Sequence, residues 1–185
     1  ATEASMMEGL RLLKAEAHFL IAFADLGGAG EPADTVERLS SLADASIGAA
    51  VDFLLRDADR ANKPRLPDPG RPGMESGLIV LGMGKLGARE LNFSSDIDLI
   101  VFFDPEAKAI VEPYEANDLF TRLARRLVRI LQDRTEHGYV FRTDLRLRPD
   151  PGSTPLAIPV SAALHYYESR GQNWERAAMI KARPV

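Results

Sequence analysis

Cysteine is absent from the 185 residues of this chain. Its absence excludes disulfide bonds, thiolate metal sites and a cysteine nucleophile. It is also typical of proteins in the reducing cytoplasm, where we expect this one. No apolar run is long enough to span a bilayer, and the first residues lack the basic and apolar regions of a signal peptide. We therefore expect no membrane partner.

A strong excess of charge of either sign is lacking as well. The net charge is −4, with 27% charged and 45% hydrophobic residues, which is an ordinary composition for a globular protein with a buried core. Such a balance gives no general sign of nucleic-acid binding. We therefore predict no nucleic-acid partner and look for function in local arrangements of residues.

Apolar residues at helical spacing predict two helices in the N-terminal third of the chain. The first covers residues 4–26. The second begins near Asp34, which with Glu37 resembles a capping box, and it continues to about Arg60. We expect residues 1–62 to form an antiparallel helical pair.

Residues 63–77 are dense in proline and glycine, which predicts a connecting loop. Strand-like and helical patterns then alternate over 78–185, and the last residues still follow a helical pattern. We therefore expect 78–185 to be a core that is truncated at the C-terminus. The expected strands are 78–81, 97–103 and 139–147; the expected helices are 115–133, one capped by Ser161 that ends before Gly171, and one capped by Asn173 that reaches Pro184.

Two carboxylates, Asp96 and Asp98, stand at the start of the apolar run 97–103. Because side chains alternate along a strand, they point to the same face and repel each other. Beside an apolar strand this arrangement costs stability unless a cation neutralises it. Oxygen ligands favour a hard ion, so we predict a divalent metal such as Mg²⁺ at this position.

A third carboxylate, Asp144, shares a face of the expected strand 139–147 with Arg142, Arg146 and Arg148. One interpretation is structural, because arginine pairs readily with carboxylate. The other is that three carboxylates from adjacent strands bind two metals, while the arginines hold phosphate groups. The residues alone leave both interpretations open.

Glycines follow the first expected strand as Gly82-Met83-Gly84-Lys85-Leu86-Gly87. The letters match a dinucleotide-binding fingerprint, but the distance to the next strand is too short for the helical crossover of that fold. The spacing of a Walker A motif is missing too. A glycine loop can still surround phosphates with its N–H groups, and Ser94 and Ser95 add hydroxyl donors just before Asp96.

This order of glycine loop, Asp-x-Asp strand and third Asp resembles the DNA-polymerase-β-like nucleotidyltransferase superfamily. The segments "GMGKLGARELNFSSDIDLI", "FRTDLRLRP" and "WERAAMIKAR" resemble the glutamine synthetase adenylyltransferase family of bifunctional adenylyltransferase/adenylyl-removing enzymes. The resemblance covers about 77–185. The sequence around Asp96 and Trp174 is more similar to the N-terminal, adenylyl-removing half of that family.

The resemblance implies an α+β polymerase-β-like nucleotidyltransferase fold, with a small mixed sheet flanked by helices, for 78–185. It implies a Mg²⁺-dependent enzyme that removes AMP from a tyrosine of glutamine synthetase by phosphorolysis and releases ADP. Glutamine synthetase, and a PII-type signal protein in the full-length enzyme, are the implied partners. The alternatives are the ATP-dependent half that adds AMP, and a non-catalytic nucleotide-binding regulatory domain.

Carried onto this sequence, the family's pattern also assigns residues. Asp96, Asp98 and Asp144 would be catalytic and would bind two Mg²⁺ ions. The implied nucleotide and phosphate contacts are Gly82, Gly84, Lys85, Ser94, Ser95, Arg146 and Arg148.

Two further expectations concern residues outside this set. Arginines at 122, 125, 126 and 129 recur along one side of the expected helix 115–133, which predicts a solvated basic face. Trp174 is expected to be a core anchor, because a large aromatic side chain is usually buried.

Overall fold

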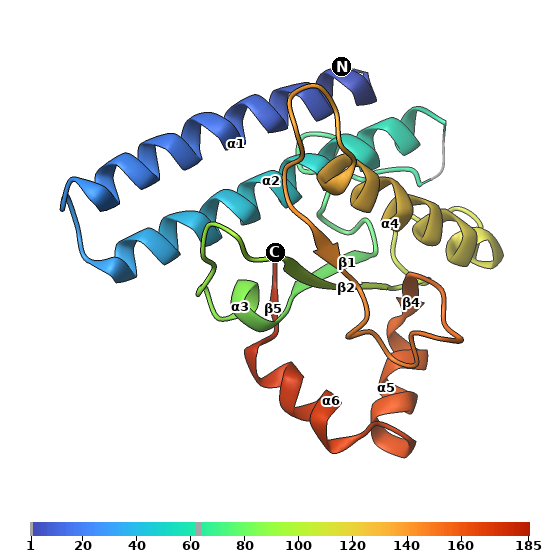
Figure 1. Ribbon diagram of the computed structural model, residues 1–185. Helices are drawn as coiled ribbons and strands as arrows, with labels where there is room; N and C mark the ends of the chain where they lie inside the picture. Colours follow the sequence, from blue (N-terminus) through green and yellow to red (C-terminus); the bar gives the residue numbers. More distant parts are fainter. Residues whose placement is uncertain (1, 62–63) are drawn as a thin grey trace.

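Two long helices form the N-terminal part of the computed structural model, which describes residues 2–61 and 64–185 (Figure 1). Helix α1 covers Glu3–Leu26 and is capped by Thr2, whose hydroxyl accepts a hydrogen bond from the N–H of Ser5 at 3.2 Å. Helix α2 covers Pro32–Arg60 and returns antiparallel to α1. The predicted helical pair is confirmed.

The predicted start of α2 at Asp34 is wrong. The helix begins at Pro32, and the capping box consists of Glu31 and Asp34, with the Glu31 N–H donating to Asp34 Oδ2 at 3.0 Å. Proline suits the first turn of a helix, because its fixed φ is helical and its missing N–H is not needed there. The helix therefore starts two residues earlier than the Asp34–Glu37 pair suggests.

A five-stranded mixed sheet lies below the helical pair within the described residues. The strands are β1 Leu78–Gly82, β2 Ile97–Phe103, β3 Thr143–Asp144, β4 Ala157–Pro159 and β5 Arg183–Pro184. Strand β2 is antiparallel to β1 and parallel to β3 and β4, and its residues are buried except for the half-buried Asp98. The predicted central strand is confirmed, and the antiparallel β1–β2 pair has no dinucleotide-fold crossover.

The predicted strand 139–147 is wrong over most of its length, because only Thr143–Asp144 pairs with β2. The N–H groups of Val140 and Phe141 both donate to Leu131 O, at 2.9 and 3.0 Å, at the end of the preceding helix. Both side chains are buried although they are consecutive. Residues 140 and 141 therefore bond to the end of the preceding helix and pack in the core, and the alternation of apolar residues did not indicate this.

Helix α4, Ala116–Gln132, follows the 3₁₀ turn Pro113–Glu115 and agrees with the predicted helix. Helix α5 covers Val160–Ser169, and Pro159 rather than Ser161 occupies its cap position. Helix α6 is shorter than predicted, Asn173–Ala178. A 3₁₀ turn, Met179–Lys181, and β5 follow it, so the predicted helix to Pro184 is wrong.

Helix α4 connects the helical pair to the sheet. Its predicted apolar face is buried, as shown by Leu119, Leu123, Leu127, Ile130 and Leu131. These side chains belong to one hydrophobic core that also contains residues of α1, α2, β1 and β2. The helical pair and the sheet therefore share a core.

The predicted solvated basic face of α4 is wrong for part of its length. Arg126 forms ion pairs with Glu3 at 2.8 Å and with Asp57 at 2.7 Å, and Arg129 also pairs with Glu3. These arginines join α4 to α1 and α2. The prediction for Trp174 is also wrong, because this residue is 58% exposed on α6.

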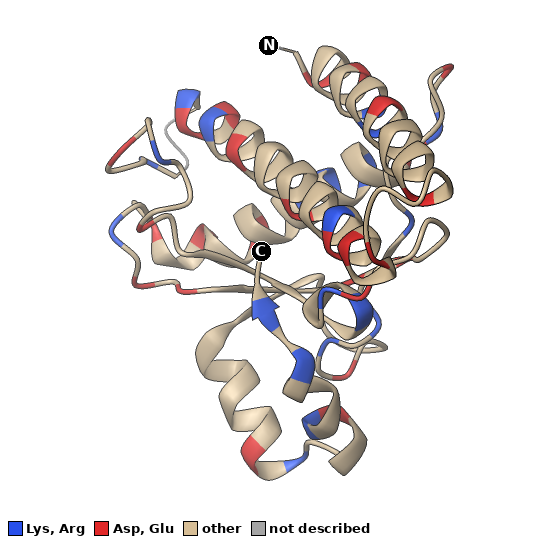
Figure 2. Cartoon of the chain, turned by 90° about the vertical axis from the view of Figure 1, so that its left-hand side faces the viewer, with Lys and Arg blue, Asp and Glu red and all other residues tan. Residues whose placement is uncertain are grey.

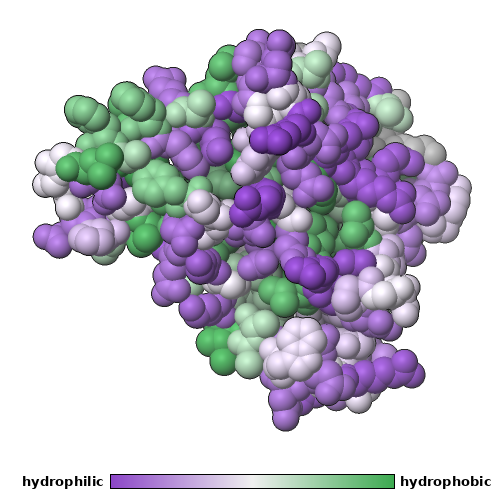
Figure 3. Space-filling view, in the orientation of Figure 1, coloured by the Kyte–Doolittle hydropathy of each residue, from purple (hydrophilic) through white to green (hydrophobic). Residues whose placement is uncertain are grey.

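Apolar side chains gather on the outer face of α1, at the left of Figure 3. They are at least half exposed: Leu12, Phe19, Leu20, Phe23 and Leu26. Their helical spacing gives α1 a second apolar stripe besides the one packed on the core. None of the helices in the described ranges is both long and apolar enough to cross a membrane.

Candidate functional site

The three predicted carboxylates lie at one end of the sheet. In the parallel register of β2 and β3, Asp98 is paired with Asp144 and Ile97 with Thr143. The Ile97 N–H also donates to Arg142 O at 2.9 Å, which extends the pairing by one residue. Asp96 immediately precedes β2, so pairing of the two strands brings all three acids to the same region.

Asp98 is the half-buried member of this group. Burial raises the pKa of its carboxyl, and repulsion from Asp144 and then Asp96 raises the pKa further. The positive charges of Arg146 and Lys85 partly oppose this rise in the pKa of Asp98. Within the described part of the chain, no group donates a hydrogen bond to this carboxylate, so its oxygens remain available to a cation.

Asp96 and Asp144 are each held by one arginine. Arg142 Nε donates to Asp96, and its other nitrogen donates to Ser94 O at 2.8 Å. Arg146 donates to Asp144 Oδ2 through Nε at 2.8 Å and through a terminal nitrogen at 2.6 Å. This hydrogen bonding lowers the pKa of Asp144. The Arg146 side chain is 85% exposed, so it can leave Asp144 without disturbing the core.

The predicted glycine loop is a single helical turn, α3, at Gly84–Gly87. Gly84 has φ +51°, and a Cβ built there would lie 2.7 Å from Asp98 Oδ2. Glycine is therefore required for the backbone to approach this carboxylate. Lys85 is exposed on the same turn. Gly82, by contrast, is buried, and a Cβ there would lie 2.9 Å from a methyl group of Val185, which is a packing role.

The other predicted phosphate contacts differ in their surroundings. Ser94 and Ser95 form the turn before Asp96, where the Ser95 hydroxyl donates to Asn92 Oδ1 at 2.9 Å. The Arg148 guanidinium donates to carbonyls of its own loop, including Leu145 O at 2.9 Å and Pro151 O at 2.8 Å. The structure thus brings Lys85 and Arg146 to the carboxylates, while Arg148 holds the loop.

Sequence reasoning missed Arg142 as a residue of the site. The alternation of side chains puts Arg142 on the face of Asp144, whereas its guanidinium bonds to Asp96, just before the neighbouring strand β2. The signal that could have identified it is its position two residues before Asp144, which places it opposite the start of β2. It fixes the turn that carries Ser94 and Asp96.

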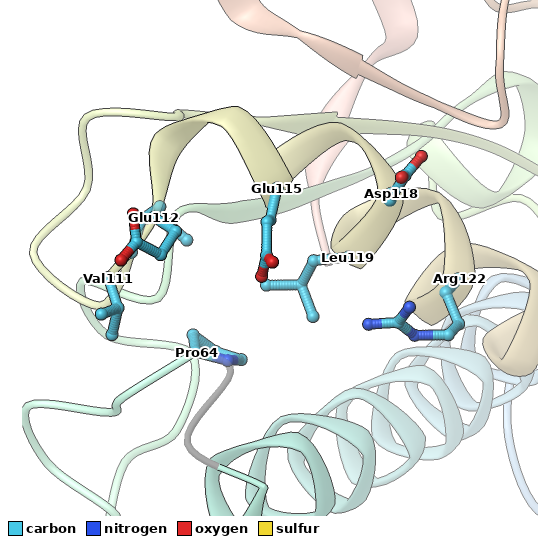
Figure 4. A pocket seen from close by; sticks show the side chains of 8 residues that line it. Pro64, Val111, Glu112, Glu115, Asp118, Leu119 and Arg122 are labelled. Atoms are coloured by element: carbon cyan, nitrogen blue, oxygen red, sulfur yellow. The ribbon is translucent and has the colours of Figure 1, made fainter.

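A cavity of about 200 Å³ lies elsewhere, beside the start of α4. Figure 4 shows Glu112, Glu115 and Arg122 around it. None of the predicted site residues lines this cavity. The carboxylate group at the end of β2 and β3 is therefore separate from this cavity.

The donor set suits a hard cation, because its ligands are all carboxylate oxygens. Among the residues that the structure describes, no three histidine, cysteine, aspartate or glutamate side chains are arranged to hold a metal ion. The ion pairs with Arg142 and Arg146 explain why these carboxylates do not converge on one point, because they turn Asp96 and Asp144 toward guanidinium groups. Among the described residues nothing donates a hydrogen bond to the Asp98 carboxylate, whereas Asp96 accepts from Arg142 and Asp144 from Arg146.

These observations define an α+β protein whose central strand presents a carboxylate group to a glycine-rich helical turn. Residues 1–185 match the family model described as glutamate-ammonia ligase adenylyltransferase. The chain belongs to this family.

Curated relatives are named bifunctional glutamine synthetase adenylyltransferase/adenylyl-removing enzyme. The chain is 73% identical over 184 residues to that of Mesorhizobium japonicum. It is 67% identical to that of Brucella suis and 62% identical to that of Agrobacterium fabrum. The matches cover 99–100% of this chain but 18–19% of each relative. The chain therefore spans about a fifth of the length of these proteins.

Proposed function

We propose that this chain is a Mg²⁺-dependent nucleotidyltransferase core that removes AMP from a tyrosine of adenylylated glutamine synthetase. The reaction is a phosphorolysis that releases ADP, and it would regulate nitrogen assimilation. The observation that carries the proposal is the carboxylate group, in which the Asp98 carboxylate accepts no hydrogen bond within residues 2–61 and 64–185 and is repelled by Asp96 and Asp144. Residues 78–185 would form the catalytic core, with a polymerase-β-like nucleotidyltransferase fold.

Asp96, Asp98 and Asp144 would hold the metal, two ions in our proposal. Bound Mg²⁺ supplies positive charge that polarises the adenylyl phosphate and steadies the attacking and leaving oxygens. The negative charge of Asp98 is the least compensated of the three, so a cation would stabilise it most. The exposed Arg146 would leave Asp144 and bind the substrate instead. Inorganic phosphate is a competent nucleophile near neutral pH, so Asp144 need not act as a base.

Phosphate groups would lie between Lys85 on α3 and the released Arg146. Both side chains are exposed and close enough to Asp98 to influence its pKa. Gly84 has no side chain, so the backbone at this position can approach a phosphate group. The hydroxyls of Ser94 and Ser95 lie on the turn before Asp96. In this arrangement arginine provides a forked donor for phosphate oxygens and lysine a point charge.

The second candidate is the forward reaction, in which AMP from ATP is added to the glutamine synthetase tyrosine. The printed names of the relatives contain both activities, and the carboxylates serve either direction. The adenylyl-removing direction is preferred because the segments around Asp96 and Trp174 are more similar to that half of the family. A PII-type signal protein is proposed as a regulator of the longer protein only.

The test incubates the chain with adenylylated glutamine synthetase, inorganic phosphate and Mg²⁺ and measures ADP. We expect ADP to form, and the double substitution Asp96→Asn with Asp98→Asn to abolish it while circular dichroism shows an intact fold. Near-normal ADP formation by the double variant would contradict the role of the carboxylates. AMP transfer from ATP without phosphorolysis would favour the forward direction.

A further inference from the structure

One carboxylate on α2, Asp44, bridges two arginines from distant parts of the chain. Its Oδ1 accepts from Arg183 on β5 at 2.8 Å, and its Oδ2 pairs with Arg89 at 3.4 Å. Asp44 and Arg183 both have side chains 23% exposed. We call these three residues the Asp44 network.

Both arginines of the network lie against α3. Arg183 donates a second hydrogen bond to Leu86 O at 3.1 Å. Arg89 lies two residues after the turn and has φ +60°, a left-handed conformation that surrounding contacts must maintain in a residue other than glycine. Its guanidinium is also held by Glu37 and, at 2.9 Å, by the Ser41 hydroxyl of α2.

The last residues of the chain close on the same turn. A Cβ at Gly87 would lie 1.9 Å from Lys181 O, so the backbone at 181 rests directly on α3. Lys181 Nζ pairs with Glu90 at 3.0 Å just after the turn. Figure 2 shows basic positions at and just before the last strand, below the label C.

The turn fixed in this way borders the carboxylate site. Gly84, at its start, touches Asp98 so closely that a Cβ there would lie 2.7 Å from Oδ2. Lys85, the next residue, contributes to the charge around Asp98. A displacement of α3 would therefore change the space and the charge beside Asp98.

We infer that the Asp44 network positions α3 against Asp98, so that the helical pair takes part in building the site. Asp44 is a positioning residue, since its carboxylate contacts Arg89 and Arg183 and not the carboxylate group. The inference rests on the proposed function for its effect on Mg²⁺, but the placement of α3 is a separate, measurable claim.

The test compares Asp44→Ala with Asp52→Ala in the 185-residue chain. Asp52 lies on the same helix. Among the described residues its only ion pair is with Arg56, four residues further along the helix, at 3.5 Å. Hydrogen exchange would be followed at the N–H groups of Ala88 and Glu90, which donate to Gly84 O at 3.1 Å and Lys85 O at 2.8 Å. Calorimetry would measure the affinity for Mg²⁺.

We expect Asp44→Ala to accelerate exchange at these two amides by roughly tenfold and to weaken Mg²⁺ binding by roughly threefold to tenfold. Asp52→Ala should change neither. If Asp44→Ala does not fold, Asp44→Asn removes the charge at nearly constant volume and should show the same direction of change. Unchanged exchange in a folded Asp44 variant would overturn the inference.

The substitution Arg183→Met provides a second arm. If the network acts as one unit, combining Asp44→Ala with Arg183→Met should weaken Mg²⁺ binding less than the sum of the two single changes. Full additivity would overturn the network. If the unmodified chain binds no Mg²⁺, the proposed function fails, and the exchange of the Ala88 and Glu90 amides alone decides the positioning of α3.

Discussion

Asp98 and Asp144 lie side by side across β2 and β3, yet their surroundings shift their pKa values in opposite directions. Burial and two neighbouring carboxylates raise the pKa of Asp98, whereas the hydrogen bonds from Arg146 lower that of Asp144. The charge of one residue therefore works against the fold, and the charge of the other supports it. This difference can be measured without a substrate.

The substitution Asp98→Asn should stabilise the chain at neutral pH in the absence of metal. The folded state binds the Asp98 proton more tightly than the unfolded state does, so stability falls as pH rises from the ordinary carboxyl range through the raised pKa. The advantage of the variant should disappear below that range, where both forms are neutral. Urea unfolding at several pH values measures it.

Asp144→Asn is the matched control and should behave oppositely. Its lowered pKa means that ionised Asp144 stabilises the folded state above the ordinary carboxyl range, and that this stability is lost as pH falls through the lowered pKa. The variant should therefore be less stable than the parent at neutral pH. A gain in stability for Asp144→Asn would show that the Arg146 contact does not form in solution.

Gly87→Ala tests the close approach of the C-terminal segment to α3. Its methyl group would lie 1.9 Å from Lys181 O and 2.6 Å from Gly82 O, so backbone must shift. We expect a loss of about 3 kcal/mol in the free energy of unfolding. Gly48→Ala in α2, where a Cβ meets nothing within 4 Å, should instead gain about 0.5–1 kcal/mol. Equal effects in thermal unfolding would contradict the packing.

At the scale of elements, regular patterns were predicted and irregular ones were not. The apolar spacing of α4 and the continuous apolar run of β2 indicated a helix and a central strand, and both are present. Strand β3 failed because Val140 and Phe141 bond to the end of α4, a contact between segments that periodicity does not contain. Strand β4 was missed because Ala157–Pro159 is too short to show a pattern.

The three carboxylates of the candidate site could be named from the sequence, but their arginine partners could not. The spacing of Asp96 and Asp98 named the carboxylates, yet the register of β2 and β3 decides that Asp98 faces Asp144. With this register, Arg142 forms an ion pair with Asp96 and Arg146 forms one with Asp144. The ion-pair partner of each carboxylate depends on how the strands pair in the folded chain, so a sequence motif could not predict it.

Arg11 connects α1 to the end of α4 and is 1% exposed. Its guanidinium donates to Gly138 O at 2.9 Å, Met7 O at 2.8 Å and Ile130 O at 3.1 Å. Arg11→Met would remove all three of these hydrogen bonds, including the donor to the buried Ile130 O, and we expect a loss of about 3 kcal/mol.

Arg125→Met on α4 is the control for Arg11→Met. Arg125 is exposed and has no ion pair among the described residues, so its replacement should change stability by less than about 0.5 kcal/mol. Chemical denaturation measures both variants. A similar small effect for both would mean that Arg11 does not join the two helices in solution.

At the scale of the whole molecule, the shared core couples the site to global stability. Residues of α1, α2, α4 and the sheet pack in one hydrophobic cluster, so a ligand that binds only the folded chain should raise its melting temperature. At a Mg²⁺ concentration ten times Kd, the expected stabilisation is about 1.4 kcal/mol. For a chain of this size that corresponds to a rise of about 4 °C.

The rise should occur in the parent and vanish when Asp96→Asn and Asp98→Asn are combined, since the double variant lacks two of the proposed ligands. Sodium chloride at matched ionic strength separates binding from screening, because exposed charges respond to both salts. A rise in the parent with Mg²⁺ alone would support a metal at the carboxylates. An equal rise in the double variant would place the ion elsewhere and would remove the main support for the nucleotidyltransferase proposal.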